Sequence, residues 1–181
     1  MPKIVDHAAY RHELLRRTTA VFLENGYAEV SMREIAGAID VSTGTLYHYF
    51  PSKEELFCHL FLFHARESSA QLVNDLCGVE GRKRRLDRLF DFFLRECDGM
   101  RTQFLLSADM VRHQLPPKAM NLVNRWSTNL KRRLGELIGV DQTTREMIFC
   151  FLSGTLYTRI VSGKGTDLAP VFHRFRKMLE A

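Results

Sequence analysis

The sequence contains few of the residues that interrupt helices. Its 181 residues include only 5 prolines and 11 glycines, and its β-branched residues do not fall in the alternating runs that mark strands. Hydrophobic residues make up 45% of the chain, which is enough apolar surface for a buried core. These features predict an all-α fold.

Motifs for metal, redox or covalent chemistry are also missing. The four cysteines are scattered without the paired spacing of a metal or redox site, so we expect reduced, mostly buried thiols at Cys58, Cys77, Cys97 and Cys150. No serine stands in a nucleophile elbow, and no metal-hydrolase motif appears. We therefore predict that the protein is not an enzyme and holds neither a cofactor nor a metal.

Two short patterns resemble functional sites only superficially. The stretch SGKGTD (162–167) lacks the spacing and the preceding strand of a phosphate-binding loop, and we interpret it as a loop between helices. Asp109 and His113 stand four residues apart, a spacing that permits a shared metal, but an exposed ion pair is the favoured interpretation.

Long hydrophobic runs are absent. The first residues lack the apolar segment of a signal peptide, and no run approaches the ~20 apolar residues that cross a bilayer. We expect a cytoplasmic protein without a membrane partner.

The charge is mildly basic, with a formal net charge of +5. Residues 1–52 nevertheless contain five basic and six acidic residues, so the positive excess lies downstream, in residues 82–88 and 131–133. A basic chain is compatible with a nucleic-acid partner. If the opening segment binds DNA, it must use helix N-termini, hydroxyls and a few well-placed cations.

Apolar periodicity and breaks divide the chain into about nine helices. The first is predicted from about residue 6 to residue 24, where apolar residues recur every three or four positions and Gly26 can end the helix in a left-handed conformation. A long fourth helix is expected over 53–76. Later helices are expected at about 81–97, 100–113, 117–138, 142–162 and 168–180.

Serine caps mark three helix starts within about twenty residues, at Ser31, Ser42 and Ser52. Glu34 and Glu55 complete capping boxes with the first and the third of these serines. Two short helices joined by a tight turn at Asp40 predict a helix-turn-helix.

The helix after Ser42 is predicted to have one buried face and several functional ones. Leu46 and Phe50 are four residues apart and anchor it to the core. Its other faces carry hydroxyls near free backbone N–H groups and aromatic side chains with polar tips, a combination that suits phosphate oxygens and base edges. These side chains are Thr43, Thr45, Tyr47 and His48.

The segment ENGYAEVSMREIAGAIDVSTGTLYHYFPSKEELF (24–57) resembles the DNA-binding domain of the TetR family of bacterial transcriptional regulators, and the similarity extends over roughly residues 10–57. The resemblance implies a helix-turn-helix DNA-binding domain at 1–52 and a larger helical domain for effector binding and dimerisation at 53–181. It also implies a homodimer on a palindromic double-stranded operator. The DNA-binding residues it implies are Ser42, Thr43, Thr45, Tyr47, His48 and Lys53, with Lys53 matching a phosphate-contacting lysine.

Three positions depart from the family's pattern. Asp40 replaces the common turn glycine, and aspartate tolerates the left-handed conformation better than most residues. Thr43 stands where a basic residue is frequent, which predicts a different base preference or affinity. Arg17 and Thr18 stand in the first helix where the family often has small residues, so the packing of this helix does not follow from the resemblance.

The C-terminal part has many aromatic side chains, with 13 phenylalanines in the whole chain. Each one taken singly is better explained as core, but together with polar residues they suit an apolar cavity with a few orienting groups. The candidate effector-pocket residues are Phe61, His64, Phe93, Phe104, Met110 and Trp126. The last two helices are the candidate dimer surface, with Phe151, Thr155, Val171, Phe172 and Phe175.

Repression is the usual mode of the family, so the resemblance implies a repressor, and the aromatic composition predicts that a small apolar or aromatic effector releases it from its operator. Two alternatives remain open at this point. One is a DNA-binding regulator without a small ligand, controlled by a protein partner or by its abundance. The other is a helical carrier or enzyme with a vestigial helix-turn-helix.

Overall fold

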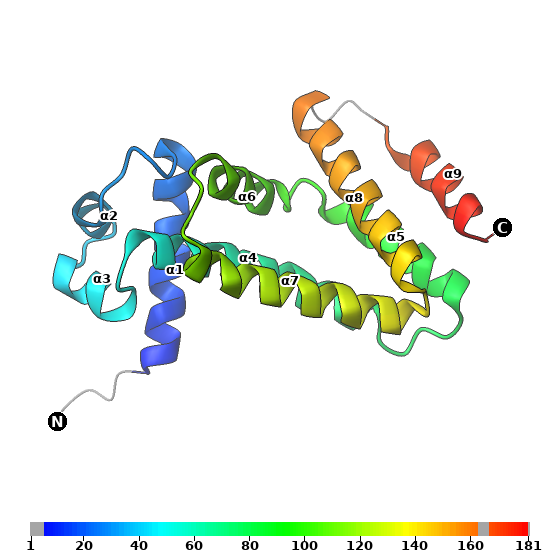
Figure 1. Cartoon of the computed structure of the whole chain (residues 1–181), viewed down its shortest axis with the longest axis horizontal. Helices are drawn as coiled ribbons and strands as arrows, with labels where there is room; N and C mark the ends of the chain where they lie inside the picture. Colours follow the sequence, from blue (N-terminus) through cyan, green and yellow to red (C-terminus); the bar gives the residue numbers. More distant parts are fainter. Residues whose placement is uncertain (1–5, 163–166, 181) are drawn as a thin grey trace. The chain divides into compact units, whose positions relative to one another are not determined.

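A computed structural model describes residues 6–162 and 167–180. Over these residues the chain forms nine helices and no strand, which confirms the predicted all-α class (Figure 1). Most of the SGKGTD stretch, residues 163–166, lies outside the described residues. The helices are α1 (His7–Asn25), α2 (Met32–Ala38), α3 (Thr43–Tyr49), α4 (Lys53–Leu76), α5 (Arg82–Glu96), α6 (Arg101–Arg112), α7 (Pro117–Ile138), α8 (Gln142–Ser162) and α9 (Ala169–Glu180).

The predicted caps account for the starts of α2, α3 and α4. Ser31 and Glu34 form a complete capping box, and the Ser42 side chain accepts a hydrogen bond from the Thr45 amide. The Ser52 hydroxyl accepts one from the Glu55 amide at 3.2 Å. Each bond satisfies a backbone donor that a helix start would otherwise leave unpaired.

The chain packs as two compact units. One contains residues up to Arg66 together with Leu105–Asn124, and the other contains Glu67–Phe104 and Arg125–Ala181. The packing units therefore interleave along the sequence. The predicted division at residue 52 concerns function rather than packing, and it stays a prediction.

The first unit is built around the helix-turn-helix. Within it, α2 contacts both α1 and α3, and the two short helices α2 and α3 lie beside the longer α1 (Figure 1). Leu14, Ile35, Leu46 and Phe50 are fully buried. This apolar centre holds the short helices, which would be marginal in isolation.

Arg17 and Thr18 have specific places in α1. Thr18 is fully buried, and its hydroxyl donates to the Leu15 carbonyl at 2.9 Å, so its polar atom is satisfied inside its own helix. The Arg17 guanidinium donates to the Ile39 carbonyl. It thereby caps the C-terminal end of α2, next to the turn that leads to α3.

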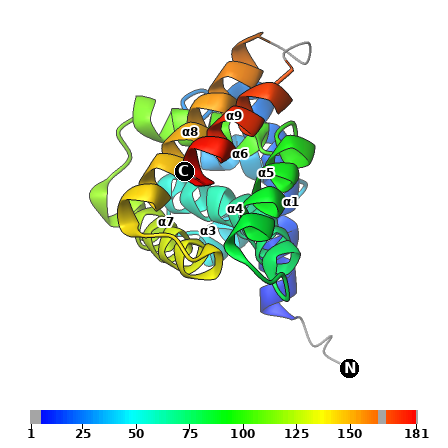
Figure 2. The same cartoon turned by 90° about the vertical axis from the view of Figure 1, so that its right-hand side faces the viewer.

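The second unit has an aromatic core. Phenylalanines from α5, α8 and α9 pack against one another within the larger apolar cluster of this unit, and α8 and α9 run side by side in both views (Figure 2). The Phe151 and Phe175 rings stack with centroids 3.9 Å apart. Phe172 meets the Phe90 ring edge to face, at 5.5 Å.

The cysteines are divided between interior and surface. Cys58 and Cys97 are buried, whereas Cys77 and Cys150 are exposed, and all four are free thiols. The expectation of mostly buried thiols is therefore wrong for half of them. Among the described residues, no helix is both long and apolar enough to cross a membrane.

The turn between α2 and α3 depends on Asp40, whose φ is 52°. We predict that Asp40→Gly folds with an unfolding free energy equal to or up to about 1 kcal/mol above that of the wild type, because glycine adopts this conformation freely. Asp40→Val should lose about 1–2 kcal/mol, because a side chain branched at Cβ is strained there. Urea unfolding followed by far-UV circular dichroism measures both. Equal stability of the two variants would contradict the assigned strain.

Candidate nucleic-acid interface

Two buried apolar side chains anchor helix α3 to the core of the first unit. Leu46 and Phe50 are both 0% exposed, as their spacing predicts. Tyr47 is 48% exposed, and His48 is exposed beside it. The helix therefore cannot rotate without exposing Leu46, and its orientation keeps the Tyr47 and His48 side chains in solvent.

The hydroxyls at the start of α3 bind one another. The Ser42 and Thr45 hydroxyl oxygens are 2.8 Å apart, and the same Ser42 oxygen accepts the Thr45 amide at 2.9 Å. Ser42 therefore acts first as the cap of the helix. Thr43 and Thr45 are half-buried, so Tyr47 and His48 are the longer and more accessible side chains of the predicted set.

Lys53, the first residue of α4, has a structural role in the free protein. Its ammonium donates to the carbonyl oxygens of Tyr27 and Val30, each at 2.9 Å, and lies 4.4 Å from the centre of the Tyr27 ring. These contacts tie the segment between α1 and α2 to the start of α4. An ammonium has three N–H donors, so two of them are used here.

Tyr27 is the residue that the sequence analysis missed. Its side chain is buried, its hydroxyl donates to Glu54 at 3.1 Å, and its backbone amide donates to the Asp109 carboxylate at 3.2 Å. The His113 ring lies 5.3 Å from the Tyr27 ring. Asp109 and His113, expected to form an exposed ion pair, instead both contact Tyr27.

The same contacts set the ionisation of the two side chains. Burial, followed by the nearby Glu54 charge, raises the pKa of Tyr27. The pKa of Glu54 is lowered, first by a hydrogen bond from its own backbone amide and further by Ser52 and Tyr27. Ionised Glu54 therefore stabilises the fold above its unfolded pKa, and this contribution is lost as the pH falls through the folded value.

The family comparison matches this part of the chain. Residues 14–60 fit the sequence model described as bacterial regulatory proteins, tetR family. The match covers all of α2 and α3, the end of α1 and the start of α4. Residues 14–60 are therefore similar to the characteristic domain of this family.

Curated relatives match this chain over a short stretch only. The transcriptional repressor KstR of Mycobacterium tuberculosis is 48% identical over 46 residues, which cover 25% of this chain and 21% of KstR. The regulator UidR of Escherichia coli K12 is 33% identical over 69 residues, 38% of this chain and 35% of UidR. The chain thus aligns with about a fifth to a third of the length of these relatives.

Solved structures of transcriptional regulators resemble nearly the whole chain in fold. A transcriptional regulator from Saccharomonospora viridis in complex with choline has a TM-score of 0.73 at 19% identity, covering 96% of this chain and 97% of that one. The regulator FadR from Bacillus subtilis in complex with stearoyl-CoA has a TM-score of 0.71 at 20% identity, covering 94% and 97%. At such identities the likeness shows the fold alone.

The predicted effector-pocket residues fall in both packing units of this chain. Phe61, His64 and Met110 belong to the first unit, and Phe93, Phe104 and Trp126 to the second. The His64 ring nitrogen and the Thr19 hydroxyl are 2.9 Å apart, and Met110 is buried. Phe93 packs in the aromatic core against Phe172, so its burial is explained without a ligand.

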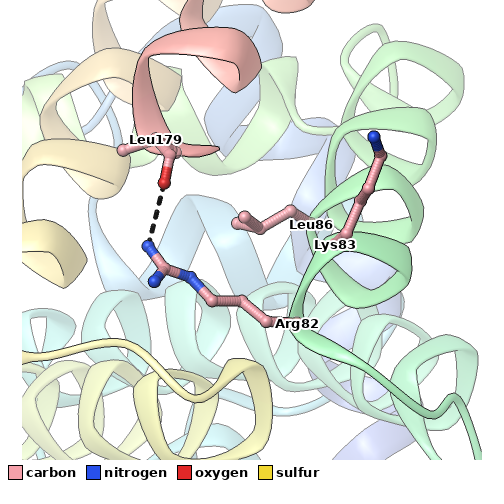
Figure 3. A pocket seen from close by; sticks show the side chains of 4 residues that line it. All are labelled: Arg82, Lys83, Leu86 and Leu179. Atoms are coloured by element: carbon pink, nitrogen blue, oxygen red, sulfur yellow. Dashed lines mark hydrogen bonds between the residues drawn. The ribbon is translucent and has the colours of Figure 1, made fainter. Parts of the chain in front are cut away.

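A shallow surface pocket of about 200 Å³ lies elsewhere, between the start of α5 and the end of α9. Arg82, Lys83, Leu86 and Leu179 line it, and the Arg82 guanidinium donates to the Leu179 carbonyl at 3.0 Å (Figure 3). None of the predicted effector-pocket residues lines this pocket.

The predicted dimer residues differ in exposure. Phe172 is only 3% exposed, whereas Val171 is 45% exposed. Phe151 and Phe175 are half-buried in the aromatic core. Thr155 is buried, with its hydroxyl bonded to carbonyls of its own helix. Val171 is therefore the member of the set with the most surface free for a partner.

We predict that Lys53→Met lowers the free energy of unfolding by about 1–3 kcal/mol, because it leaves the Tyr27 and Val30 carbonyls without their donor. Lys118→Met is the matched control, since Lys118 is exposed in the same unit and its loss should change stability by less than about 0.5 kcal/mol. Urea unfolding measures both. Equal, small effects would show that the Lys53 contacts contribute little.

Proposed function

We propose that this chain is a DNA-binding transcriptional regulator that reads the major groove with α3. One observation carries the proposal: Leu46 and Phe50 are fully buried, while Tyr47 and His48 on the same short helix stand in solvent. Side chains with polar tips and flat bodies can reach phosphate oxygens and base edges. Residues 1–52 have a net charge of −1 with neutral histidines, so contact geometry rather than a bulk basic field directs binding.

The regulator acts as a homodimer through α8 and α9. Support comes from large apolar side chains left exposed on these helices: Met147, Tyr157, Val161, Val171 and Met178. Gly154 is also exposed on α8, with open space where a side chain would stand, so a partner helix can approach closely. Two helices from each subunit make a four-helix interface about a two-fold axis.

A two-fold dimer determines the form of the operator. Two α3 helices about 34–36 Å apart meet successive major grooves on one side of the duplex, and a longer site suits a wider separation. The operator is therefore palindromic double-stranded DNA.

A small effector releases the repressor from this operator. The structural relatives in complex with choline and with stearoyl-CoA support a ligand site in the helical part, and the aromatic content of this chain suits an apolar or aromatic ligand. A ligand shifts the equilibrium only by its differential affinity for the two states. Typical coupling is ~1–3 kcal/mol, so an induction factor above ~150 needs more than that range.

The contacts of Tyr27 support a route from the ligand-binding helices to the DNA-reading end. Helix α4 holds Tyr27 through Lys53 and Glu54, and α6 holds its amide through Asp109. A tilt of α4 on effector binding therefore acts on the segment that connects α1 to α2. Because α2 contacts α3, the separation of the two α3 helices in the dimer changes.

Salt dependence tests the DNA-binding function against a carrier or an enzyme. Affinity for random-sequence duplex DNA should fall steeply between about 50 and 200 mM salt, because phosphate contacts release counterions. Affinity that does not change over this range would remove the DNA-binding proposal.

Tyr47→Ala tests the role of α3. On a duplex selected from a random pool by the wild-type protein, we expect binding to weaken about 10- to 100-fold, the loss of one good contact. The melting temperature should not change, because Tyr47 is half exposed. Leu23→Ala, which truncates an exposed apolar side chain on α1, should bind as the wild type does. Equal binding by both variants would show that α3 is not the reading helix.

The dimer surface is tested by Val171→Glu combined with Met178→Glu. Two carboxylates on an apolar interface are costly to bury, so sedimentation should show monomers. Both side chains are largely exposed in the single chain, 45% and 62%, and the fold should persist. Val111→Glu on α6, where Val111 is 76% exposed, is the control and should stay dimeric. A dimeric double variant would contradict the assigned surface.

A further inference from the structure

The first residue of α1 lies against the last residues of α3. The Nδ1 atom of His7 and the Tyr49 hydroxyl oxygen are 2.8 Å apart, and the His7 and His48 ring centroids are 6.3 Å apart. His7 and His48 are exposed, and Tyr49 is half-buried. His7 thus extends the solvent-facing surface of α3 beyond the residues that the sequence assigns to it.

The backbone at the start of α1 is not free to hold an anion. The Asp6 carboxylate accepts hydrogen bonds from the Ala8 and Ala9 amides, at 3.0 and 3.1 Å. These two amides are therefore already occupied, and the His7 and Tyr49 side chains are polar groups that a phosphate at this point can meet.

The bond between His7 and Tyr49 has two forms. When the His7 imidazole is neutral with its proton on Nε2, Nδ1 accepts the proton of the Tyr49 hydroxyl. When His7 takes one proton from solvent at Nδ1, that nitrogen becomes a donor to the Tyr49 oxygen. The hydroxyl proton of Tyr49 can then turn to another acceptor, while the contact between His7 Nδ1 and the Tyr49 oxygen is kept.

A proton on His7 changes the net charge of the N-terminal segment. Histidine side chains change charge between about pH 5 and 8, and residues 1–52 have a net charge of −1 with their histidines neutral. One protonated imidazole cancels this net negative charge, at the point where α1 meets α3.

We propose that His7 and Tyr49 form a further contact to the DNA backbone that strengthens as the pH falls. Protonated His7 supplies a positive charge, and Tyr49 donates its released hydroxyl proton to a phosphate oxygen. This inference rests on the proposed function, since it places a phosphate beside α3.

Few other ionisable groups face this pair among the described residues. From α3 there is His48, whose ring meets the Tyr49 ring edge to face, with centroids 5.1 Å apart. From α1, Tyr10 packs on Tyr49 at 5.4 Å, and Arg11 lies 4.8 Å from the Phe50 ring. The Asp6 carboxylate at the start of α1 binds the Ala8 and Ala9 amides.

The test measures binding of the full chain to a rhodamine-labelled random-sequence duplex of about three helical turns at low salt. Between about pH 8 and pH 6 we expect the wild-type affinity to rise at least about threefold. One linked proton sets the upper limit, which is about tenfold per pH unit. His7→Gln and Tyr49→Phe should each remove the same part of this rise. The double variant should remove no more than either one, because the two side chains act as a unit.

A second readout is the salt dependence at about pH 6. The slope of log affinity against log salt should be steeper for the wild type than for His7→Gln by about 0.9, the value of one phosphate neutralised. His48 remains in every variant and accounts for any pH dependence that persists.

His12→Gln is the matched control. His12 is exposed on the same helix, but its ring faces Phe63 of α4 at 5.7 Å, so this variant should keep the full rise. Far-UV circular dichroism verifies that each variant is folded.

The outcomes separate this inference from the proposed function. If His7→Gln or Tyr49→Phe keeps the full rise, or if His12→Gln loses it, the inference is wrong even though salt-sensitive DNA binding persists. If the wild type binds the duplex at no pH, the proposed function fails as well.

Discussion

The burial of Leu46 and Phe50 is the constraint on which the rest of the proposed DNA-binding surface depends. A helix of seven residues has little stability of its own, and these two side chains hold α3 in one rotation against the first unit. The rotation decides which side chains meet solvent. Ser42 caps the helix, Arg17 closes the end of α2, and Asp40 makes the turn. All three contacts hold the position that the apolar pair determines.

Tyr27 is a second residue on which the packing of the first unit depends. A single residue between α1 and α2 is held by α4 through Lys53 and Glu54 and by α6 through Asp109. Lys53, which matches a phosphate-contacting lysine only by resemblance, thus has a structural role within the free chain.

The phenylalanines show why composition is a weak guide to a ligand site. Phe93 was assigned to a pocket and Phe172 to a dimer surface, yet their rings lie 5.9 Å apart in one core. An apolar side chain has the same chemistry whether it contacts a ligand, a second subunit or its own chain. The exposed fraction of the side chain distinguishes core from surface. On α9 it identifies Val171 and Met178 as the large apolar side chains that remain exposed.

Local signals in the sequence determined the helices, their caps and the inward direction of Leu46 and Phe50, because these features depend on neighbours within about four residues along the chain. The left-handed turn at Asp40 follows from the same short-range chemistry. Tertiary structure alone decided the partners of Lys53, the joining of Asp109 to Tyr27 across 82 positions and the pairing of His7 with Tyr49. These contacts join residues far apart in sequence, and no periodicity or cap specifies which distant groups will meet when the helices pack.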